Sequence, residues 1–124
     1  MERKSVLIIE DEMIHGMLLK SSIENSGYRV LDVISRGEDA VNAAIDHRPD
    51  LIISDILLKG GINGVDAIEQ ILNHIDIPSI FLTALSDTGI MKQANETSPS
   101  AIINKPYDMK MLIETVNSLL NINK

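Results

Sequence analysis

Polar side chains that could do chemistry together stand at the ends of several short apolar runs. They are Glu10, Asp11, Asp55, Thr83 and Lys105. Carboxylates that lie close together repel each other unless a cation joins them, and Mg²⁺ suits a site of carboxylates, a carbonyl and water that also holds a phosphoryl group. A lysine ammonium and a threonine hydroxyl would neutralise the oxygens of that group. The predicted chemistry is attack of the Asp55 carboxylate on a phosphoryl donor.

These side chains can meet only if the runs before them are strands of one parallel sheet. Apolar, partly β-branched runs between turn formers, such as Leu51–Ser54, are typical of strands buried on both faces. They alternate with segments in which apolar residues recur at helical spacing, as Ile14, Met17 and Leu18 do. The alternation predicts an α/β fold, a single-domain (βα)5 doubly wound parallel sheet with the flavodoxin-like strand order 2-1-3-4-5. In that order the carboxyl ends of the strands share one edge, where the first and third strands are neighbours.

Some residues predict local structure rather than chemistry. Ser35–Glu38 has the S-x-x-E form of a capping box, which predicts that a helix begins there. The histidines fall on predicted helices or helix ends remote from the strand-end edge, and we expect solvated helix faces for His15, His47 and His74. Neither feature adds a residue to the predicted site.

Composition narrows the class of function. The chain has 124 residues, near the usual size of one domain, and contains no cysteine for a disulfide or a thiolate metal site. Its net charge of −7 has the wrong sign for binding nucleic acid phosphates, and its aromatic content of 2% leaves little for base stacking. Met1–Ser5 leads into an apolar run too short for a signal peptide or a membrane span. We therefore expect one cytoplasmic domain with no direct nucleic acid partner and no membrane partner.

The motifs at the strand ends resemble those of a response-regulator receiver domain of two-component signalling, and the resemblance covers the chain from end to end, residues 1–124. The motifs are, in order, Glu10-Asp11, Ser54-Asp55, Thr83-Ala84 and Lys105-Pro106. The resemblance implies that a histidine kinase phosphorylates Asp55 in a Mg²⁺-dependent reaction, within a phosphorelay that switches a protein-interaction surface. It also implies that the domain turns over no free substrate and in that sense is not an enzyme.

The metal ligands that the resemblance implies lie after the first and third predicted strands. Asp11 would bind Mg²⁺ directly, and Glu10 would bind it through a water molecule. Asp55 and the backbone carbonyl of Leu57 would complete the ligands that the protein supplies. Mg²⁺ is thus the cofactor that the resemblance implies.

The implied phosphoryl contacts come from the fourth and fifth predicted strands. Thr83 would hydrogen-bond a phosphoryl oxygen and reorient on phosphorylation, while Lys105 would pair with the phosphoryl group. The Lys105–Pro106 peptide bond is expected to be cis. Many receivers carry a tyrosine or phenylalanine three residues before the lysine-proline pair, but this chain has Ile102 there. The consequence of that difference for switching stays open.

The resemblance also implies protein partners. The phosphoryl donor would be a sensor histidine kinase or a phosphotransfer protein, and the phosphorylated state would act on a downstream output protein or domain. The output face would comprise the predicted fourth helix (86–97), fifth strand (101–104) and fifth helix (109–120), through which a homodimer could also form.

Other classes of function stay open at this point. The chain could be an unphosphorylated pseudo-receiver that acts only as a protein-interaction module, although it keeps the acidic pair, Asp55, Thr83 and Lys105. An FMN-binding flavodoxin is disfavoured because the loop after the first strand is acidic rather than a phosphate cradle. A phosphatase with an Asp nucleophile would usually have a second Asp two positions on, where Leu57 stands. Taken alone, Asp55 could be an ordinary loop aspartate.

Overall fold

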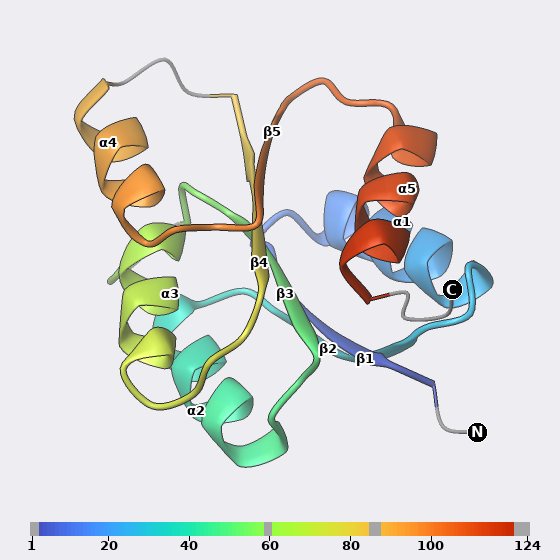
Figure 1. Cartoon of the computed structure of the whole chain (residues 1–124), viewed down its shortest axis with the longest axis horizontal. Coiled ribbons are helices and arrows are strands. Elements are labelled where there is room, and N and C mark those ends of the chain that lie inside the picture. The colour runs from blue at the N-terminus through green and yellow to red at the C-terminus, as the bar shows by residue number, and fades with distance from the viewer. Residues whose placement is uncertain (1–2, 59–60, 85–87, 121–124) are drawn as a thin grey trace.

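Strands and helices alternate along the described chain (Figure 1). The structure is a computed structural model, which describes residues 3–58, 61–84 and 88–120. The strands are β1 (Ser5–Ile9), β2 (Arg29–Ile34), β3 (Leu51–Asp55), β4 (Ser79–Thr83) and β5 (Ala101–Asn104). The helices are α1 (Met13–Asn25), α2 (Gly37–His47), α3 (Gly64–Leu72), α4 (Thr88–Glu96) and α5 (Met109–Leu120). None of these described helices is long and apolar enough to cross a bilayer.

The strands form a parallel sheet in the order β2-β1-β3-β4-β5, as predicted. The order reverses between β1 and β3, which is the switch point where ligands bind in sheets of this kind. Ile9 of β1 pairs with Ser54 of β3. The next residues along the two strands, Glu10 and Asp55, therefore leave this part of the sheet side by side.

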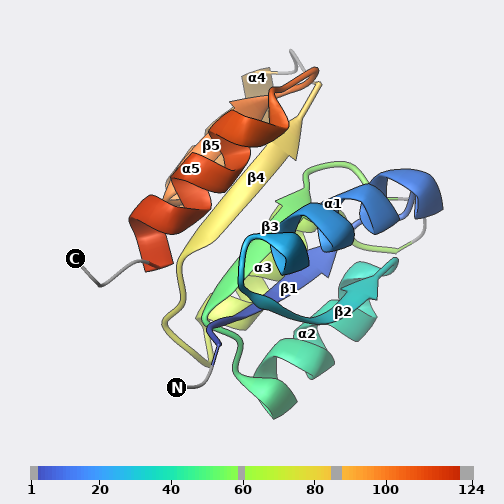
Figure 2. The same ribbon diagram turned by 90° about the vertical axis from the view of Figure 1, so that its right-hand side faces the viewer.

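Helices cover both faces of the sheet. α2, α3 and α4 lie on one face, and α1 and α5 lie on the other (Figure 1, Figure 2). Along β1, Leu7 and Ile9 belong to the core on the α2 and α3 side, while Val6 and Ile8 belong to the core on the α1 and α5 side. Each of these side chains is at most 1% exposed. A strand buried on both faces needs an apolar residue at every position, which explains the continuous apolar runs in the sequence.

α1 has apolar side chains on its solvent side as well as on its buried side. Its buried residues are Gly16, Leu19 and Ile23. A Cβ at Gly16 would lie 2.8 Å from Cγ1 of Val33, so the glycine lets the helix lie close to the sheet. On the other side of the helix, residues that are 57% to 77% exposed form a set that we call the exposed α1 face, namely Met13, Ile14, Met17 and Leu18. The helical spacing in the sequence thus located the helix but not its buried side.

The capping box lies on a different helix from the one predicted. α2 has Arg36 at its N-cap and no side-chain hydrogen bond there, so the prediction of a box at Ser35–Glu38 is wrong. Arg36 instead contacts Glu38 at 3.4 Å. α3 has the box, because Oδ1 of Asn63 accepts from the backbone N–H of Asp66 at 2.8 Å and Oδ2 of Asp66 accepts from that of Asn63 at 3.3 Å. This box fixes the N-terminus of α3.

Candidate functional site

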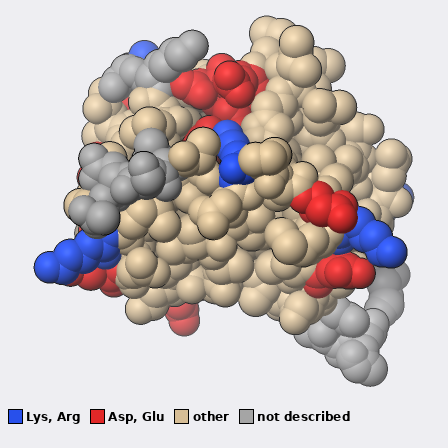
Figure 3. Space-filling model, turned by 90° about the horizontal axis from the view of Figure 1, so that it is seen from above, with Lys and Arg blue, Asp and Glu red and all other residues tan. Residues whose placement is uncertain are grey.

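The predicted site residues converge at the carboxyl edge of the sheet. Figure 3 shows this edge from above, with a cluster of acidic side chains next to a basic one. Asp55 is the last residue of β3, Thr83 is the last residue of β4, and Lys105 follows β5 directly. The backbone N–H of Lys105 donates to the carbonyl of Thr83 at 2.7 Å, and that of Ile56 donates to the carbonyl of Leu82 at 3.2 Å. Sheet hydrogen bonding therefore continues into the loops that carry the site.

Asp55 and Lys105 form an ion pair. Nζ of Lys105 lies 2.8 Å from Oδ2 of Asp55, and the two side chains are 22% and 13% exposed. Oδ1 of Asp55 accepts a longer hydrogen bond, 3.4 Å, from the backbone N–H of Leu57. Burial alone lowers the pKa of Lys105, but the hydrogen bond and charge of Asp55 raise it above its ordinary value. The Lys105–Pro106 peptide bond is cis, as predicted.

Glu10, Asp11 and Asp55 can each offer a carboxylate oxygen to one ion, since these oxygens lie within 4.8 Å of one another. Glu10 is only 2% exposed, and burial raises its pKa, with the charge of Asp55 adding to the rise. The backbone N–H of Glu12 opposes the rise by donating to Oε2 of Glu10 at 3.1 Å. Carboxylates this close favour a cation between them, and hard oxygen ligands suit Mg²⁺. The residues present therefore fit the predicted ion.

A hollow of about 570 Å³ opens beside the ion pair. Its walls come from the segments that follow or end β1, β3, β4 and β5, with Asp11, Glu12, Asp55, Leu57, Leu58, Ala84 and Lys105 as described lining residues. Leu57 is 48% exposed, lies two residues beyond Asp55 and lines this hollow. The binding of an ion by the Leu57 carbonyl stays a prediction.

Thr83 stands one strand away from Asp55. Asp55 pairs with Leu82 across β3 and β4, so that Thr83 lies one residue further toward the carboxyl edge. It is fully buried, and it pairs with Asn104, the residue before Lys105. Its contact with a phosphoryl group stays a prediction.

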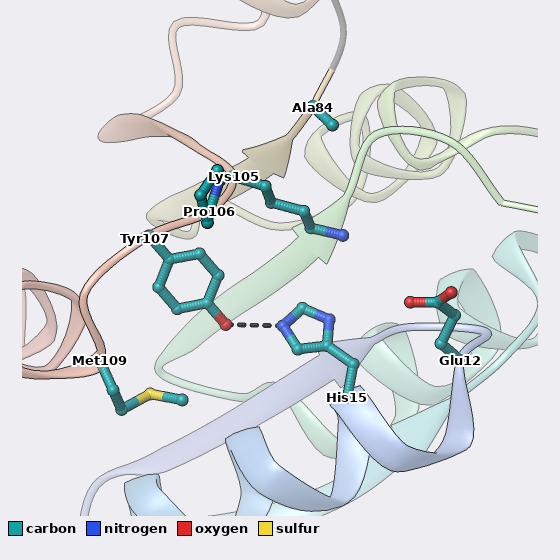
Figure 4. Close-up of a pocket in the computed structure, with 7 residues that line it drawn as sticks. All are labelled: Glu12, His15, Ala84, Lys105, Pro106, Tyr107 and Met109. Carbon is teal, nitrogen blue, oxygen red and sulfur yellow. Dashed lines mark hydrogen bonds between the residues drawn. The ribbon is translucent and has the colours of Figure 1, made fainter.

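His15 belongs to the site, so the prediction that the histidines lie remote from it is wrong for this residue. Its Nδ1 lies 2.5 Å from Oε1 of Glu10, and its Nε2 lies 2.7 Å from the hydroxyl of Tyr107 (Figure 4). His47 and His74 are exposed, as predicted. A signal for His15 was available: helical side chains point toward the N-terminus of their helix, so a residue in the first turn of α1 covers the loop that precedes it.

Tyr107 lines a second hollow of about 570 Å³, which shares Glu12, Ala84 and Lys105 with the first. Figure 4 shows the residues around it, namely Glu12, His15, Ala84, Lys105, Pro106, Tyr107 and Met109. Burial raises the pKa of Tyr107 to about 12, with help from the negative charges of Glu10 and Asp55. Tyr107 therefore keeps its hydroxyl proton at neutral pH. Nothing in its sequence position predicted this contact, because it depends on the reach of the side chain.

The chain matches the family model of the response regulator receiver domain over residues 6–117. It is 34% identical over 122 residues to the polar-differentiation response regulator DivK of Brucella anthropi, a match that covers 94% of this chain and 96% of DivK. It is 31% identical over 113 residues to the transcriptional regulatory protein PdtaR of Mycobacterium tuberculosis, which covers 91% of this chain and 55% of PdtaR. The chain thus spans about half the length of PdtaR.

Solved structures share the same fold. The signal receiver domain of a modulated diguanylate cyclase from Desulfovibrio desulfuricans G20 is similar with a TM-score of 0.89 and 31% identity. The similarity covers 96% of this chain and 94% of that one. It therefore extends over the sheet and the helices on both of its faces.

Proposed function

The chain belongs to the response regulator receiver domain family, and we propose that it accepts a phosphoryl group on Asp55. The donor would be the phosphohistidine of a sensor histidine kinase or of a phosphotransfer protein. The observation that supports this most is the ammonium of Lys105 at 2.8 Å from the Asp55 carboxylate, next to the acidic cluster that Asp55 forms with Glu10 and Asp11. A nucleophile and the charges that would neutralise the transferred group thus stand together.

In the proposed step, a carboxylate oxygen of Asp55 forms a bond to phosphorus as the bond from phosphorus to the donor's imidazole nitrogen breaks. That nitrogen keeps the electron pair of the broken bond. Lys105, already next to Asp55, would pair with the oxygens of the transferred group, and the Thr83 hydroxyl would donate a hydrogen bond to one of them. A bound Mg²⁺ would supply further positive charge to these oxygens.

We propose that Asp11 and Asp55 bind this Mg²⁺ directly, with the backbone carbonyl of Leu57, and that Glu10 binds it through water. The clustered oxygens of Glu10, Asp11 and Asp55 support this assignment. So does the buried position of Glu10, because an ionised carboxylate at 2% exposure is more stable with positive charge nearby. Lys105, whose Nζ lies 3.9 Å from Oε1 of Glu10, supplies part of that charge.

The exposed α1 face supports a protein as the phosphoryl donor. A donor histidine must reach Asp55, so the donor's surface must also cover the residues that border the site. Glu12 lines both hollows, and the exposed α1 face begins at the next residue. These apolar side chains are 57% to 77% exposed, and covering them with a partner lowers the free energy of the complex. We therefore place the docking surface of the kinase or phosphotransfer protein on this face.

Met17→Lys tests the docking surface. Transfer from a histidine kinase that phosphorylates the wild type should fall about tenfold, the effect of losing somewhat more than 1 kcal/mol of docking energy. Phosphorylation by acetyl phosphate, which needs no docking, should stay within about twofold. Met111→Lys is the matched control, because Met111 is 43% exposed on α5. Equal losses of kinase transfer in the two variants would contradict the assignment.

The proposed output face comprises α4, β5 and α5, through which a downstream protein or a second copy of the chain would bind. Ile102 on β5 is partly buried and packs against the core on the α4 side. Its side chain is aliphatic, whereas many receivers carry a tyrosine or phenylalanine at this position. We propose that switching of this face does not depend on an aromatic side chain at residue 102.

The decisive experiment is intact mass spectrometry after incubation with Mg²⁺ and acetyl phosphate. The wild type should gain one phosphoryl group, and the gain should disappear in Asp55→Asn and when EDTA replaces Mg²⁺. Asp32→Asn, which changes an exposed aspartate on β2, should behave as the wild type. Failure of a folded, Mg²⁺-binding wild type to gain mass would instead favour the unphosphorylated interaction module.

A cytoplasmic location stays a prediction.

A further inference from the structure

We propose that His15 is a positioning residue of the acidic site and that, through Tyr107, it links occupancy of this site by Mg²⁺ to the start of α5. The inference rests on the proposed function only where Glu10 is taken to help bind the ion. Its basis is a chain of hydrogen bonds that runs from Glu10 through His15 to Tyr107.

His15 fixes the orientation of the Glu10 carboxylate. Oε2 of Glu10 accepts from the backbone N–H of Glu12 at 3.1 Å, and Oε1 lies 2.5 Å from Nδ1 of His15. With one partner on each oxygen and 2% exposure, the carboxylate is held in one orientation. Without His15, Oε1 would keep only the more distant ammonium of Lys105, at 3.9 Å. His15 therefore determines the orientation in which the Glu10 carboxylate faces an ion.

The imidazole passes this constraint on to Tyr107. An ionised carboxylate can only accept, so the proton between Glu10 and His15 belongs to Nδ1. In the neutral ring Nε2 then accepts the hydroxyl proton of Tyr107, at 2.7 Å. Burial raises the pKa of Tyr107, so its hydroxyl keeps the proton that it donates. Every member of the chain thus has a partner of the right kind.

Tyr107 stands at the point where β5 passes into α5. It is partly buried and packs against the core on the α1 and α5 side. The next residue, Asp108, accepts a hydrogen bond from the backbone N–H of Lys110 at 2.8 Å and another from that of Leu112, through its carbonyl, at 3.1 Å. These are the contacts that begin α5. A change in the hydrogen bond of Tyr107 therefore acts next to the N-terminus of that helix.

Occupancy of the acidic site would change the hydrogen bond between Glu10 and His15. When Glu10 shares its negative charge with an ion, it attracts the Nδ1 proton less strongly. Nε2 of the imidazole then accepts less strongly from the Tyr107 hydroxyl. The weaker hydrogen bond of Tyr107 changes the backbone environment at the start of α5. This route uses no aromatic side chain on β5, where the chain has Ile102.

The first test follows backbone amide shifts by NMR during a Mg²⁺ titration. In the wild type, the amides of Tyr107, Lys110 and Leu112 should move with the same midpoint as those of Asp11 and Leu57. In Tyr107→Phe, the shifts at residues 110 and 112 should fall to less than about half. Tyr28→Phe is the matched control, because the Tyr28 hydroxyl donates to Asn117 on α5 but lies outside the site. It should keep the wild-type shifts.

The second test measures Mg²⁺ affinity by isothermal titration calorimetry. His15→Ala should weaken binding about tenfold, the lower end of the range for residues that orient metal ligands. His47→Ala, which changes an exposed histidine, should leave the affinity unchanged. Wild-type affinity in His15→Ala, or wild-type shifts on α5 in Tyr107→Phe, would overturn the proposal. If His15→Ala fails to fold, Tyr107→Phe alone decides it. Neither test uses phosphorylation, so failure of phosphoryl transfer to Asp55 would leave both readouts intact.

Discussion

Asp55 and Lys105 stand where their strands end, whereas His15 and Tyr107 reach the same site with long side chains from a helix turn and from a loop. The first pair is placed by sheet hydrogen bonding, and only one side-chain contact joins it, at 2.8 Å. The second pair is placed by a chain of side-chain hydrogen bonds that includes Glu10. Strand geometry therefore fixes the proposed reacting groups, while side-chain reach fixes the groups that orient them.

The largest expected effect comes from removing charge from the first pair. Lys105→Met should slow phosphorylation by acetyl phosphate about 10²- to 10³-fold, because the transferred oxygens lose a preorganised positive charge. Rates from intact mass spectrometry measure this, with exposed Lys92→Met as the control. A slowing of less than about tenfold would mean that Lys105 acts mainly in structure.

A substitution that crowds the backbone carbonyl of Asp55 should have the next largest effect. A Cβ at Gly64 would lie 1.9 Å from the carbonyl oxygen of Asp55, so Gly64→Ala should reduce the free energy of unfolding by about 3 kcal/mol. Gly27→Ala is the control: nothing lies within 4 Å of its Cβ, and only its φ of +102° opposes the change, at about 1 kcal/mol. Urea denaturation measures both. Equal losses would show that the strand end is not rigid.

Tyr107 should make the free energy of unfolding depend on pH in the alkaline range. Its pKa is raised to about 12, so the folded state keeps a proton that the unfolded state loses near the ordinary value of 10. The resulting stability is fully present below about pH 10 and is lost as pH rises toward 12, by no more than about 2 kcal/mol for this partly exposed group. Tyr107→Phe should therefore lose less stability than the wild type between pH 9.5 and 11.5 in urea denaturation. A matching loss in the two proteins would refute this.

The smallest effect is stabilisation by Mg²⁺. At about ten times its dissociation constant the ion should add about 1.4 kcal/mol to the free energy of unfolding, because it binds only the folded carboxylate cluster. Thermal unfolding with and without Mg²⁺ measures this gain. Asp11→Asn should lose most of it, since one carboxylate of the proposed ligand set becomes neutral. A gain of the same size in Asp11→Asn would point to binding elsewhere.

The sequence predicted the fold and the strand-end residues because both depend on backbone periodicity. Continuous apolar runs can be recognised as strands buried on both faces, and the order of the sheet then brings Glu10, Asp55 and Lys105 to one edge. The cis bond at Lys105–Pro106 was expected from the family resemblance instead. These features need no knowledge of how any side chain turns.

The features that the sequence did not predict depend on side-chain choice between near-equal alternatives. The apolar spacing of Ile14, Met17 and Leu18 marks a helix, but Gly16 allows the opposite side of that helix to pack on the sheet. His15 has many possible partners on a helix, and its contact with Tyr107 joins residues that are 92 positions apart. Capping also depends on side-chain choice. The side chain of Asn63 caps α3, whereas α2 has no side-chain cap.

The pairing of Ile9 with Ser54 has a consequence for how this molecule can evolve. Loss of one residue from β1 would exchange the side chains that face the two cores and would draw Glu10 back by about 3.3 Å along the strand. The two cores and the acidic cluster would fail together, so lineages must keep the lengths of β1 and β3. The outer surfaces of the helices carry no such restriction. Descendants can therefore acquire new partners on those surfaces while the strand ends stay unchanged.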